Sequence, residues 1–416
     1  MKKNRFIFVV VFAVLLQATR SNADWNQWRG PERTGEVTNE TPWPEKLGGE
    51  NLTLLWEAKL SEGYSSPVTS EGKVFTVATQ EEKNEVVRAF DLSTGEQNWN
   101  DSWKGAMKVP FFAAKNGSWV RSTPVTGDGA IYVGGMRDVL VKLDTNTGDE
   151  IWKVDFTERE KTEVPSFGQV CSPLLDGNDL YVQAGLAVAK LNAETGETIW
   201  TSLEDKRAMF GSAFSSPVIA TLGGKRQLIV QARLALAGLD LETGAELWTT
   251  PVKAFRGMNI LTPSIIGDDK VFTASYGGGA FLFSITANGE GEFAVEQLWN
   301  NEALEGYMGS PVIRGNHAYL HGRDKKLHCI SLENGEATWS TDEEFGEYWS
   351  MIHQGDRILA LDQKGELILF DASPQKFKLL DRRSISKDEP TWAHLGIEGN
   401  RLLVRSLNGI HVYEWK

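Results

Sequence analysis

The stretch Ala89-Phe90-Asp91-Leu92-Ser93-Thr94-Gly95-Glu96-Gln97-Asn98-Trp99 decides the fold. It predicts the end of one strand, a tight turn and a second strand that ends in Trp. The Asp side chain caps amides of the turn, and Gly accepts the positive φ that reverses the chain. The Trp offers a large apolar surface that wedges between sheets, and its indole N–H needs one acceptor. These residues are therefore structural, and the Asp is not a catalytic carboxylate.

The same phrase recurs along the chain. Further copies end at Trp152, Trp200, Trp248, Trp299 and Trp339. One more copy, beginning at Phe370 and Asp371, keeps its turn residues but has no Trp. Repetition with a period of roughly 40–50 residues indicates a propeller or another repeat architecture.

A second hairpin opens each repeat, and its first strand carries Ser or Thr followed by Pro. These heads contain Pro67, Pro124, Pro173, Pro217, Pro263 and Pro311, and two degenerate heads contain Met351 and Leu395. Pro cannot donate to a sheet ladder, so it favours an edge strand. The innermost strand of a propeller blade, which lines the central channel, is such an edge. Eight heads predict eight blades.

The two ends of the chain fit each other. Residues 409–415 resemble a third strand without a fourth, and residues 52–57 resemble an orphan fourth strand that ends in Trp56. We expect the N-terminal strand to complete the last blade, which removes open edges that invite aggregation. The sequence therefore predicts an all-β fold over residues 52–416: an eight-bladed β-propeller of four-stranded antiparallel blades.

Residues 1–23 have the pattern of a signal peptide. A basic start precedes an apolar run from Phe6 to Leu16, and Ser21-Asn22-Ala23 is a small-residue cleavage site. The run is shorter than the roughly 20 residues that span a bilayer, and no Cys follows it for lipid attachment. We predict cleavage after Ala23, a periplasmic or secreted location and no direct membrane span.

Residues 24–51 precede the propeller and carry Trp25, Trp28, Arg29 and Pro31. Two hypotheses stay open for this extension: it folds back as a plug on one propeller face, or it meets a partner. The formal net charge of −13 repels phosphate backbones, so nucleic acid is not an expected partner. Cys171 and Cys329 lie in different repeats and are expected to be buried free thiols.

The Asp-x-x-Thr-Gly-x-x-x-Trp phrase and the Ser-Pro-Val head resemble the repeats of PQQ-like (pyrroloquinoline quinone) propellers, over roughly residues 52–416. Two families with this architecture are the quinoprotein alcohol dehydrogenases and the outer-membrane assembly factor BamB, regarded as a non-enzymatic scaffold. Residues 24–31 also resemble the opening of secreted planctomycete-type propellers of unassigned role. Such a repeat is specific for fold and weakly specific for function.

The dehydrogenase resemblance implies PQQ with calcium, an Asp base and often an adjacent Cys pair. That pair is absent, and Asp268 and Asp269 occupy a hairpin position, where turn chemistry explains them. His317 and His321 stand about 13 Å apart on a strand, too far to share a metal. We therefore expect no catalytic, cofactor-binding or metal-binding residue. A PQQ-dependent dehydrogenase of alcohols or sugars is the alternative.

The loops that lead from each Trp into the next head lie on one propeller face. Aromatic and Arg residues anchor interfaces, so the basic and aromatic loops predict a contact surface for an envelope or secreted protein. The predicted partner-binding residues are Trp103, Lys108, Phe111, Phe112, Lys115, Trp119, Arg121, Arg207 and Arg256. The alternative is that the aromatics pack under their own loops.

A second set of aromatic residues stands three positions before the Pro positions of the heads, at the channel mouth. These are Tyr64, Phe214, Tyr348 and Trp392. They form an aromatic funnel or pack between blades. The leading hypothesis is a monomeric, non-catalytic exported propeller that serves as a binding or scaffold module of the cell envelope. An anionic-glycan-binding propeller is a further alternative.

Overall fold

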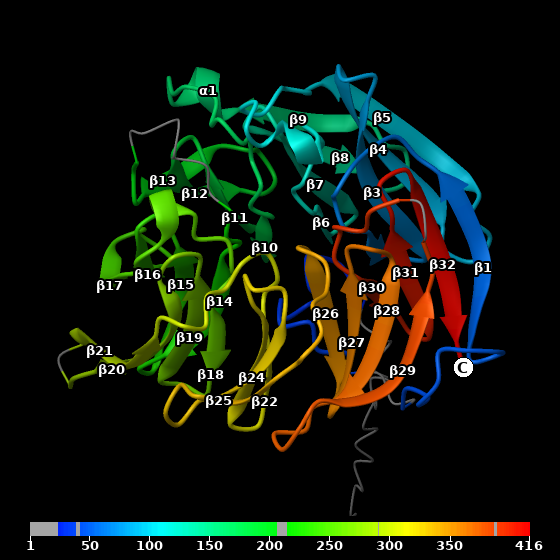
Figure 1. Cartoon of the computed structure of the whole chain (residues 1–416). Helices are drawn as coiled ribbons and strands as arrows, with labels where there is room; N and C mark the ends of the chain where they lie inside the picture. Colours follow the sequence, from blue (N-terminus) through cyan, green and yellow to red (C-terminus); the bar gives the residue numbers. More distant parts are fainter. Residues whose placement is uncertain (1–23, 39–41, 206–213, 290, 387–388) are drawn as a thin grey trace, which may run out of the picture.

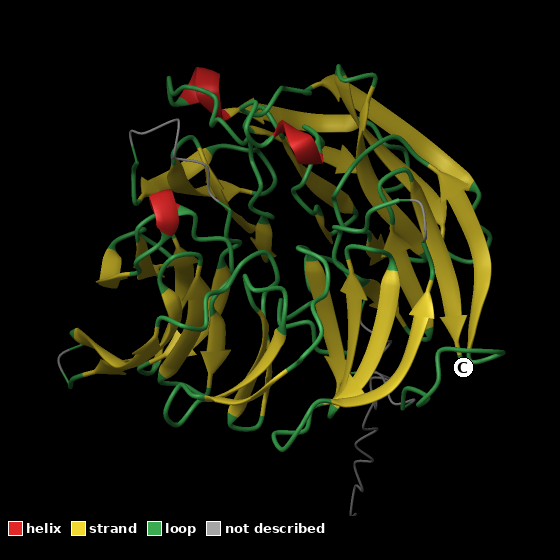
Figure 2. Cartoon of the chain, in the orientation of Figure 1, coloured by secondary structure: helices red, strands yellow, loops and turns green. Residues whose placement is uncertain are grey.

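The computed structural model describes residues 24–38, 42–205, 214–289, 291–386 and 389–416. Over these residues the regular structure is nearly all strand (Figure 2). The helical pieces described are α1 (Phe156–Arg159) and the 3-10 turns η1 (Ala114–Asn116) and η2 (Phe255–Gly257). The predicted signal peptide lies outside the described residues.

The strands form eight four-stranded antiparallel sheets arranged in a ring (Figure 1). Blade 1 contains β2 (Val68–Ser70), β3 (Lys73–Gln80), β4 (Asn84–Asp91) and β5 (Gln97–Lys104), and blade 2 contains β6 (Val125–Gly127), β7 (Ala130–Gly135), β8 (Val139–Asp144) and β9 (Glu150–Asp155). Blade 3 contains β10 (Leu174–Asp176), β11 (Asp179–Ala184), β12 (Ala187–Asn192) and β13 (Thr198–Ser202), and blade 4 contains β14 (Val218–Leu222), β15 (Lys225–Gln231), β16 (Ala235–Asp240) and β17 (Glu246–Pro251).

The second half of the ring repeats this plan. Blade 5 contains β18 (Ser264–Ile266), β19 (Lys270–Ser275), β20 (Gly279–Ala287) and β21 (Phe293–Asn301), and blade 6 contains β22 (Val312–Arg314), β23 (His317–His321), β24 (Leu327–Ser331) and β25 (Ala337–Ser340). Blade 7 contains β26 (Trp349–Gln354), β27 (Arg357–Asp362), β28 (Glu366–Asp371) and β29 (Lys378–Ser384), and blade 8 contains β30 (Gly396–Glu398), β31 (Arg401–Arg405), β32 (Gly409–Trp415) and β1 (Leu52–Lys59). The predicted eight-bladed propeller is confirmed.

The first strand of each blade is an edge of its sheet, as expected for the strand nearest the channel. In the six heads that contain Pro, the Pro stands one residue before this strand and not inside it, as with Pro67 before β2. Because Pro lacks an N–H, it is tolerated at the start of an edge strand and sets where pairing begins.

The core lies between the blades. Eight hydrophobic clusters among the described residues correspond to the eight interfaces between neighbouring sheets. At the first interface, Val77 and Val87 of blade 1 pack with Val133 and Val141 of blade 2, and all four are fully buried. Each such side chain contributes roughly 1.5–3 kcal/mol through burial. The fold is therefore stabilised mainly by contacts between successive repeats.

The repeat Trp joins each blade to the next. The indole N–H donates to a backbone carbonyl in the turn between the third and fourth strands of the following blade. The pairs are Trp56 with Leu92, Trp99 with Thr145, Trp152 with Ala193, Trp200 with Leu241, Trp299 with Leu332 and Trp339 with Ser373. The Trp does not end its strand, because β5 continues past Trp99 to Lys104.

The turn Gly makes room for this contact. A Cβ on Gly95, Gly148, Gly196, Gly244 or Gly335 would stand 2.5–2.9 Å from the Trp ring of the preceding blade. Each of these glycines also has a positive φ. The Gly of the repeat therefore meets two demands at once, a left-handed backbone and close approach of an indole.

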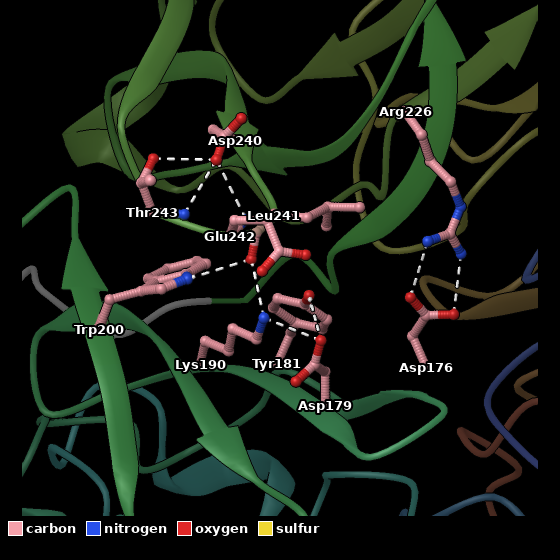
Figure 3. A network of polar contacts seen from close by, with 10 residues as sticks. All are labelled: Asp176, Asp179, Tyr181, Lys190, Trp200, Arg226, Asp240, Leu241, Glu242 and Thr243. Carbon is pink, nitrogen blue, oxygen red and sulfur yellow. Dashed lines mark hydrogen bonds and ion pairs between the residues drawn. The ribbon is translucent and has the colours of Figure 1, made fainter.

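Figure 3 shows this contact between blades 3 and 4. Trp200 and Lys190 both donate to the carbonyl of Leu241, at 3.2 and 2.9 Å. The Asp240 carboxylate accepts the amides of Glu242 and Thr243. The Lys225 ammonium, together with the hydrogen bonds from Thr243, holds the pKa of Asp240 well below its usual range. The repeat Asp is thus a turn cap, as the sequence predicts.

Two junctions depart from this pattern. Trp248 donates to Gln227 Oε1 of its own blade at 2.6 Å, because blade 5 has a longer turn after Ala287. Blade 7 has no Trp at the matching position, and blade 8 has no turn to receive one, since its third and fourth strands come from opposite ends of the chain.

The N-terminal strand closes the ring. Strand β1 pairs antiparallel with β32, from Leu52 opposite Trp415 to Lys59 opposite Gly409, and the two strands lie side by side in Figure 1. Residues 42–52 take the place of the missing turn. Arg383 of blade 7 donates to the carbonyl of Leu47 at 2.8 Å, and Trp43 stacks on Trp415 with ring centroids 4.8 Å apart.

One predicted partner residue is corrected by the fold. Trp103 is only 6% exposed, because it belongs to β5 and packs into the core between blades 1 and 2. Its indole N–H donates to Glu85 Oε2 at 3.0 Å, and Glu85 Oε1 accepts the Met136 amide at 2.7 Å. Glu85 is fully buried, and burial raises its pKa to about 7.

The Gly–Trp contact predicts a matched pair of stability effects. Gly244 and Gly129 have φ values of +72° and +73°, but only Gly244 has an indole against the site of a new Cβ, at 2.6 Å. We expect Gly129→Ala to cost about 1–2 kcal/mol through backbone strain alone. Gly244→Ala should cost roughly 1–3 kcal/mol more, through displacement of Trp200. Urea unfolding measures both, and equal losses would contradict the role given to the Trp.

Glu85 predicts a pH dependence of stability. Its pKa is raised from 4.5 to about 7 in the folded state, so the folded protein binds the proton more tightly than the unfolded chain. This contribution to stability is fully present below pH 4.5 and is lost as the pH rises through 7. Between pH 5 and 8 the free energy of unfolding should fall by roughly 1–3 kcal/mol from this group. In Glu85→Gln, whatever its absolute stability, that decline should shrink; an unchanged slope would refute the assignment.

Candidate functional site

A cavity of about 540 Å³ occupies the mouth of the channel. Its upper layer comes from one position in each blade, three residues before the Pro position of the head. The eight residues are Tyr64, Arg121, Val170, Phe214, Ile260, Met308, Tyr348 and Trp392, and all of them line the cavity. The four residues predicted at the channel mouth are among them, so the repeat brings them together around the axis.

The lower layer comes from the residues that directly precede the Pro positions. Six of them, the hydroxyl ring, carry hydroxyl groups: Ser66, Thr123, Ser172, Ser216, Thr262 and Ser310. His394 occupies the corresponding position in blade 8 and also lines the cavity. Spacing of two residues along extended backbone places both layers on the channel side.

The hydroxyl ring links neighbouring blades. From Ser66 to Thr262, the amide of each residue donates to the hydroxyl oxygen of the next blade, at 2.9–3.2 Å. The His394 amide donates to Ser66 Oγ at 2.7 Å. These amides belong to chain segments before the innermost strands, where no sheet partner satisfies them. The hydroxyls therefore replace a ladder that the edge strands lack.

The N-terminal extension lies beneath these layers. Its first residues pair with blade 1. The Trp25 amide donates to the Thr69 hydroxyl at 2.8 Å, and the Thr69 amide donates to the Trp25 carbonyl at 2.9 Å. Its other end pairs with His353 of blade 7. The Val37 amide donates to the His353 carbonyl, and the His353 amide donates to the Gly35 carbonyl, both at 2.8 Å. Residues 24–37 thus begin at blade 1 and end at blade 7, and between these ends they contact blades 3 and 6 through Arg33 and Arg29.

Trp28, in the middle of this extension, lines the cavity from below. The His394 ring meets Trp28 edge to face at 5.0 Å. The guanidinium carbons of Arg29 and Arg33 lie 5.5 and 5.7 Å from the Trp28 ring. Gly30 has a positive φ and lies against Trp25, which allows the tight turn that follows Trp28.

Three aromatic groups form a collar around the cavity. Trp392 is stacked between Tyr64 and Tyr348, with ring centroids 4.3 and 3.3 Å away. The other two groups are Phe112 with Phe167 and Phe214, and Phe255 with Tyr276 and Tyr307. Most of the collar packs between its own members, and its remaining ring surface faces the cavity.

The charge state of the lining follows from burial. Burial and the nearby charge of Arg29 together lower the pKa of His394 to about 3, so the imidazole is neutral at physiological pH. Burial raises the pKa of Tyr64 to about 12, and its hydroxyl donates to the Asn116 carbonyl at 2.6 Å. Arg121 donates to the carbonyls of Phe167 and Gly117 at 3.1 and 3.2 Å.

The predicted partner-binding residues divide into separate locations. Phe111 and Phe112 are 90% and 59% exposed, and Lys108 and Lys115 beside them are also exposed. Arg121, Arg256 and Phe112 line the cavity. Trp119 is half-buried, with its indole against Gly117. Arg207 lies outside the described residues.

Several cavity residues were not predicted from the sequence. Phe167, Tyr276 and Tyr307 come from loops outside the repeat phrase, so no periodic signal marks them. The hydroxyl ring did have a signal, namely the Ser or Thr that precedes each Pro. The sequence pattern places these heads at the channel but does not predict that their hydroxyls accept amides from the neighbouring blade.

The lining does not fit PQQ with calcium. The described residues that line the cavity include no Asp, Glu or Cys. Calcium takes six to eight oxygen ligands, usually with carboxylates among them. Across the described ranges there is also no group of three or more His, Cys, Asp or Glu side chains that could hold a metal ion. Cys171 and Cys329 are both buried and unpaired.

Comparisons with known proteins agree with this fold. The family model described as outer membrane protein assembly factor BamB matches residues 46–112 and 83–341. A search of curated protein sequences gives no match.

Within the described residues, no helix has the length and apolar character needed to cross a membrane.

Solved structures with the same architecture include a BamB protein and dehydrogenases. BamB from Moraxella catarrhalis has 16% identity and a TM-score of 0.64, over 88% of this chain and 98% of that one. The quinohemoprotein alcohol dehydrogenase from Comamonas testosteroni has 13% identity and a TM-score of 0.63, over 94% and 80%. A europium-containing methanol dehydrogenase has 11% identity and a TM-score of 0.56, over 95% and 98%. At these identities the likeness concerns the fold alone. By its family match, this chain belongs to the PQQ-like β-propeller family of the outer membrane protein assembly factor BamB.

Proposed function

We propose that this protein is a non-catalytic binding module of the cell envelope that holds a protein partner on the face where the cavity opens. The contact surface is the loop rim, defined as Lys108, Phe111, Phe112, Lys115, Phe255 and Arg256. Membership of the BamB family supports an envelope role, and the rim supports binding as the activity.

The observation that carries the proposal is the exposure of the rim phenylalanines. Phe111 is 90% exposed, Phe112 59% and Phe255 44%. Exposed aromatic side chains beside cationic ones are typical of interface hot spots. The rim is also basic in a protein whose formal net charge is −13. An acidic partner surface would therefore be attracted to this face and repelled by much of the remainder.

The loop that carries the rim is held in place by its own hydrogen bonds. The Ala113 amide donates to the Pro110 carbonyl at 2.8 Å, and the Gly117 amide donates to the Ala114 carbonyl at 3.0 Å. Tyr64 and Arg121 anchor the end of the loop from the channel side. A fixed loop loses little conformational freedom on binding, so the exposed rings are suited to contact a partner.

The cavity beneath the rim offers little for catalysis. Its hydroxyls already accept backbone amides, and His394 is neutral. A nucleophilic Ser needs a base, which is in turn oriented by a third group such as a carboxylate. The described lining includes no carboxylate. These residues support binding as the better proposal.

The rim is tested by crosslinking in the native envelope, followed by identification of the captured protein. The Phe111→Ala/Phe112→Ala variant should lower recovery of the partner roughly tenfold or more, because hot-spot aromatics contribute about 2 kcal/mol or more when truncated. Leu379→Ala is the matched control, since Leu379 is 42% exposed but lies on the outer strand β29. Equal recovery from both variants would remove the rim from the proposal.

The enzymatic alternative has its own test. The purified protein is supplied with PQQ and calcium, and absorbance and dye-linked oxidation of alcohols and sugars are measured. We expect neither stoichiometric quinone nor turnover, because the lining lacks carboxylates for calcium. A bound quinone with turnover would overturn the non-catalytic proposal.

A further inference from the structure

The floor of the cavity presents hydrogen-bond donors. Each oxygen of the hydroxyl ring accepts a backbone amide from the neighbouring blade. Each hydroxyl keeps its own proton, for which the described residues provide no acceptor within hydrogen-bond geometry. Six O–H groups around one axis can therefore donate to a group placed in the cavity.

Two buried cations lie below this ring. Arg29 and Arg33 are 2% and 4% exposed, and neither has a carboxylate partner among the described residues. Arg29 donates to the carbonyl of Pro311 at 2.6 Å, and Arg33 donates to those of Ser172 and Pro173, both at 3.0 Å. Carbonyl dipoles satisfy part of their hydrogen-bonding capacity and leave their charges without a counter-charge.

Burial disfavours these two charges. Burial lowers the pKa of Arg29 to about 9 and that of Arg33 to about 10. Their Nε atoms are buried and have no hydrogen-bond partner. Buried cations are normally paired. An anion above Trp28 would supply the missing counter-charge across one aromatic ring.

The charged side chains of the described lining are also positive. They are Arg121 and Arg256, and Arg256 has φ +53°, a left-handed conformation that is strained for a residue with a side chain. Glu347, next to Tyr348 in the chain, influences that tyrosine but does not line the cavity. A cleft lined by one sign of charge between low-dielectric walls concentrates ligands of the opposite sign.

We propose that the cavity binds a small molecule whose carboxylate is carried on a six-membered ring. The carboxylate lies at the hydroxyl ring above Trp28, and the molecule's ring lies within the aromatic collar. The volume of about 540 Å³ is that of an ordinary small-molecule site. Aromatic side chains pack against the flat face of an aromatic acid and against the C–H face of a sugar acid. This site lies inside the channel and shares Phe112, Phe255 and Arg256 with the rim, whereas Phe111 belongs to the rim alone.

The proposal is tested by isothermal titration calorimetry of the protein with two matched pairs of probes. One pair is naphthalene-2-carboxylate and naphthalene-2-carboxamide, and the other is galacturonate and galactose. At least one acid should bind with one-to-one stoichiometry and at least tenfold more tightly than its neutral partner. The pair that responds distinguishes an aromatic acid from a sugar acid. If neither acid exceeds its neutral partner tenfold, the proposal is wrong.

Variants locate the site. Arg256→Gly keeps the left-handed backbone accessible and should weaken binding of the acid at least fivefold, while binding of the neutral probe is unchanged. Lys253→Ala is the control, since Lys253 is exposed, pairs with Glu302 at 3.0 Å and does not line the cavity. Equal affinities of the two variants would overturn the assignment.

A second variant probes the buried charge. Arg33→Met should weaken acid binding at least tenfold. The melting temperature of this variant shows whether it folds. If it does not fold, the Arg256→Gly variant alone tests the location of the site. Phe111 does not line the cavity. Phe111→Ala should therefore keep acid binding intact even where it loses the protein partner, which separates failure of this proposal from failure of the rim.

Discussion

The contact between an indole and the turn of the next blade is the constraint on which this structure depends. Each four-stranded blade is too small to bury its own faces, so stability must come from its neighbours. The repeat Trp supplies both an apolar wedge and one directional hydrogen bond, and the turn Gly leaves the space that the wedge needs. Because the bond runs from blade to blade, each repeat fixes the orientation of the next, and the ring closes only when the last repeat meets the first.

The exceptions show how the chain compensates when this contact is missing. Blade 7 has no Trp, and blade 8 lacks the receiving turn because the two chain ends supply its outer strands. There, Arg383 and the stacked pair of Trp43 and Trp415 hold the strap of residues 42–52 against blade 7. The loss of Trp from the seventh repeat is therefore consistent with closure by β1, since a Trp at that position would have no turn to contact.

The sequence predicts the parts of the molecule that repeat and misses those that do not. Blade number, closure and the residues that ring the channel mouth follow from local phrases that recur in every unit. Trp103 was misplaced because a strand that continues past the repeat Trp resembles a loop when read alone. Phe167 and Tyr276 reach the cavity from loops of individual blades, and nothing periodic marks them. The buried position of Arg33 depends on a segment that crosses under the ring, which only tertiary structure reveals.

The residues of the hydroxyl ring both link neighbouring blades and line the cavity, so binding in the cavity is coupled to the contacts between blades. A hydroxyl that accepts an amide from the neighbouring blade becomes a stronger acceptor when its own proton is donated elsewhere, because hydrogen bonds in a chain polarise one another. A ligand that accepts those protons would therefore tighten the contacts between blades at the channel. Arg29 and Arg33 bind carbonyls of two separate blades, Pro311 in blade 6 and Pro173 in blade 3. Neutralising their charges would remove an electrostatic cost from the centre of the molecule, so occupancy of the cavity and stability of the propeller must rise together.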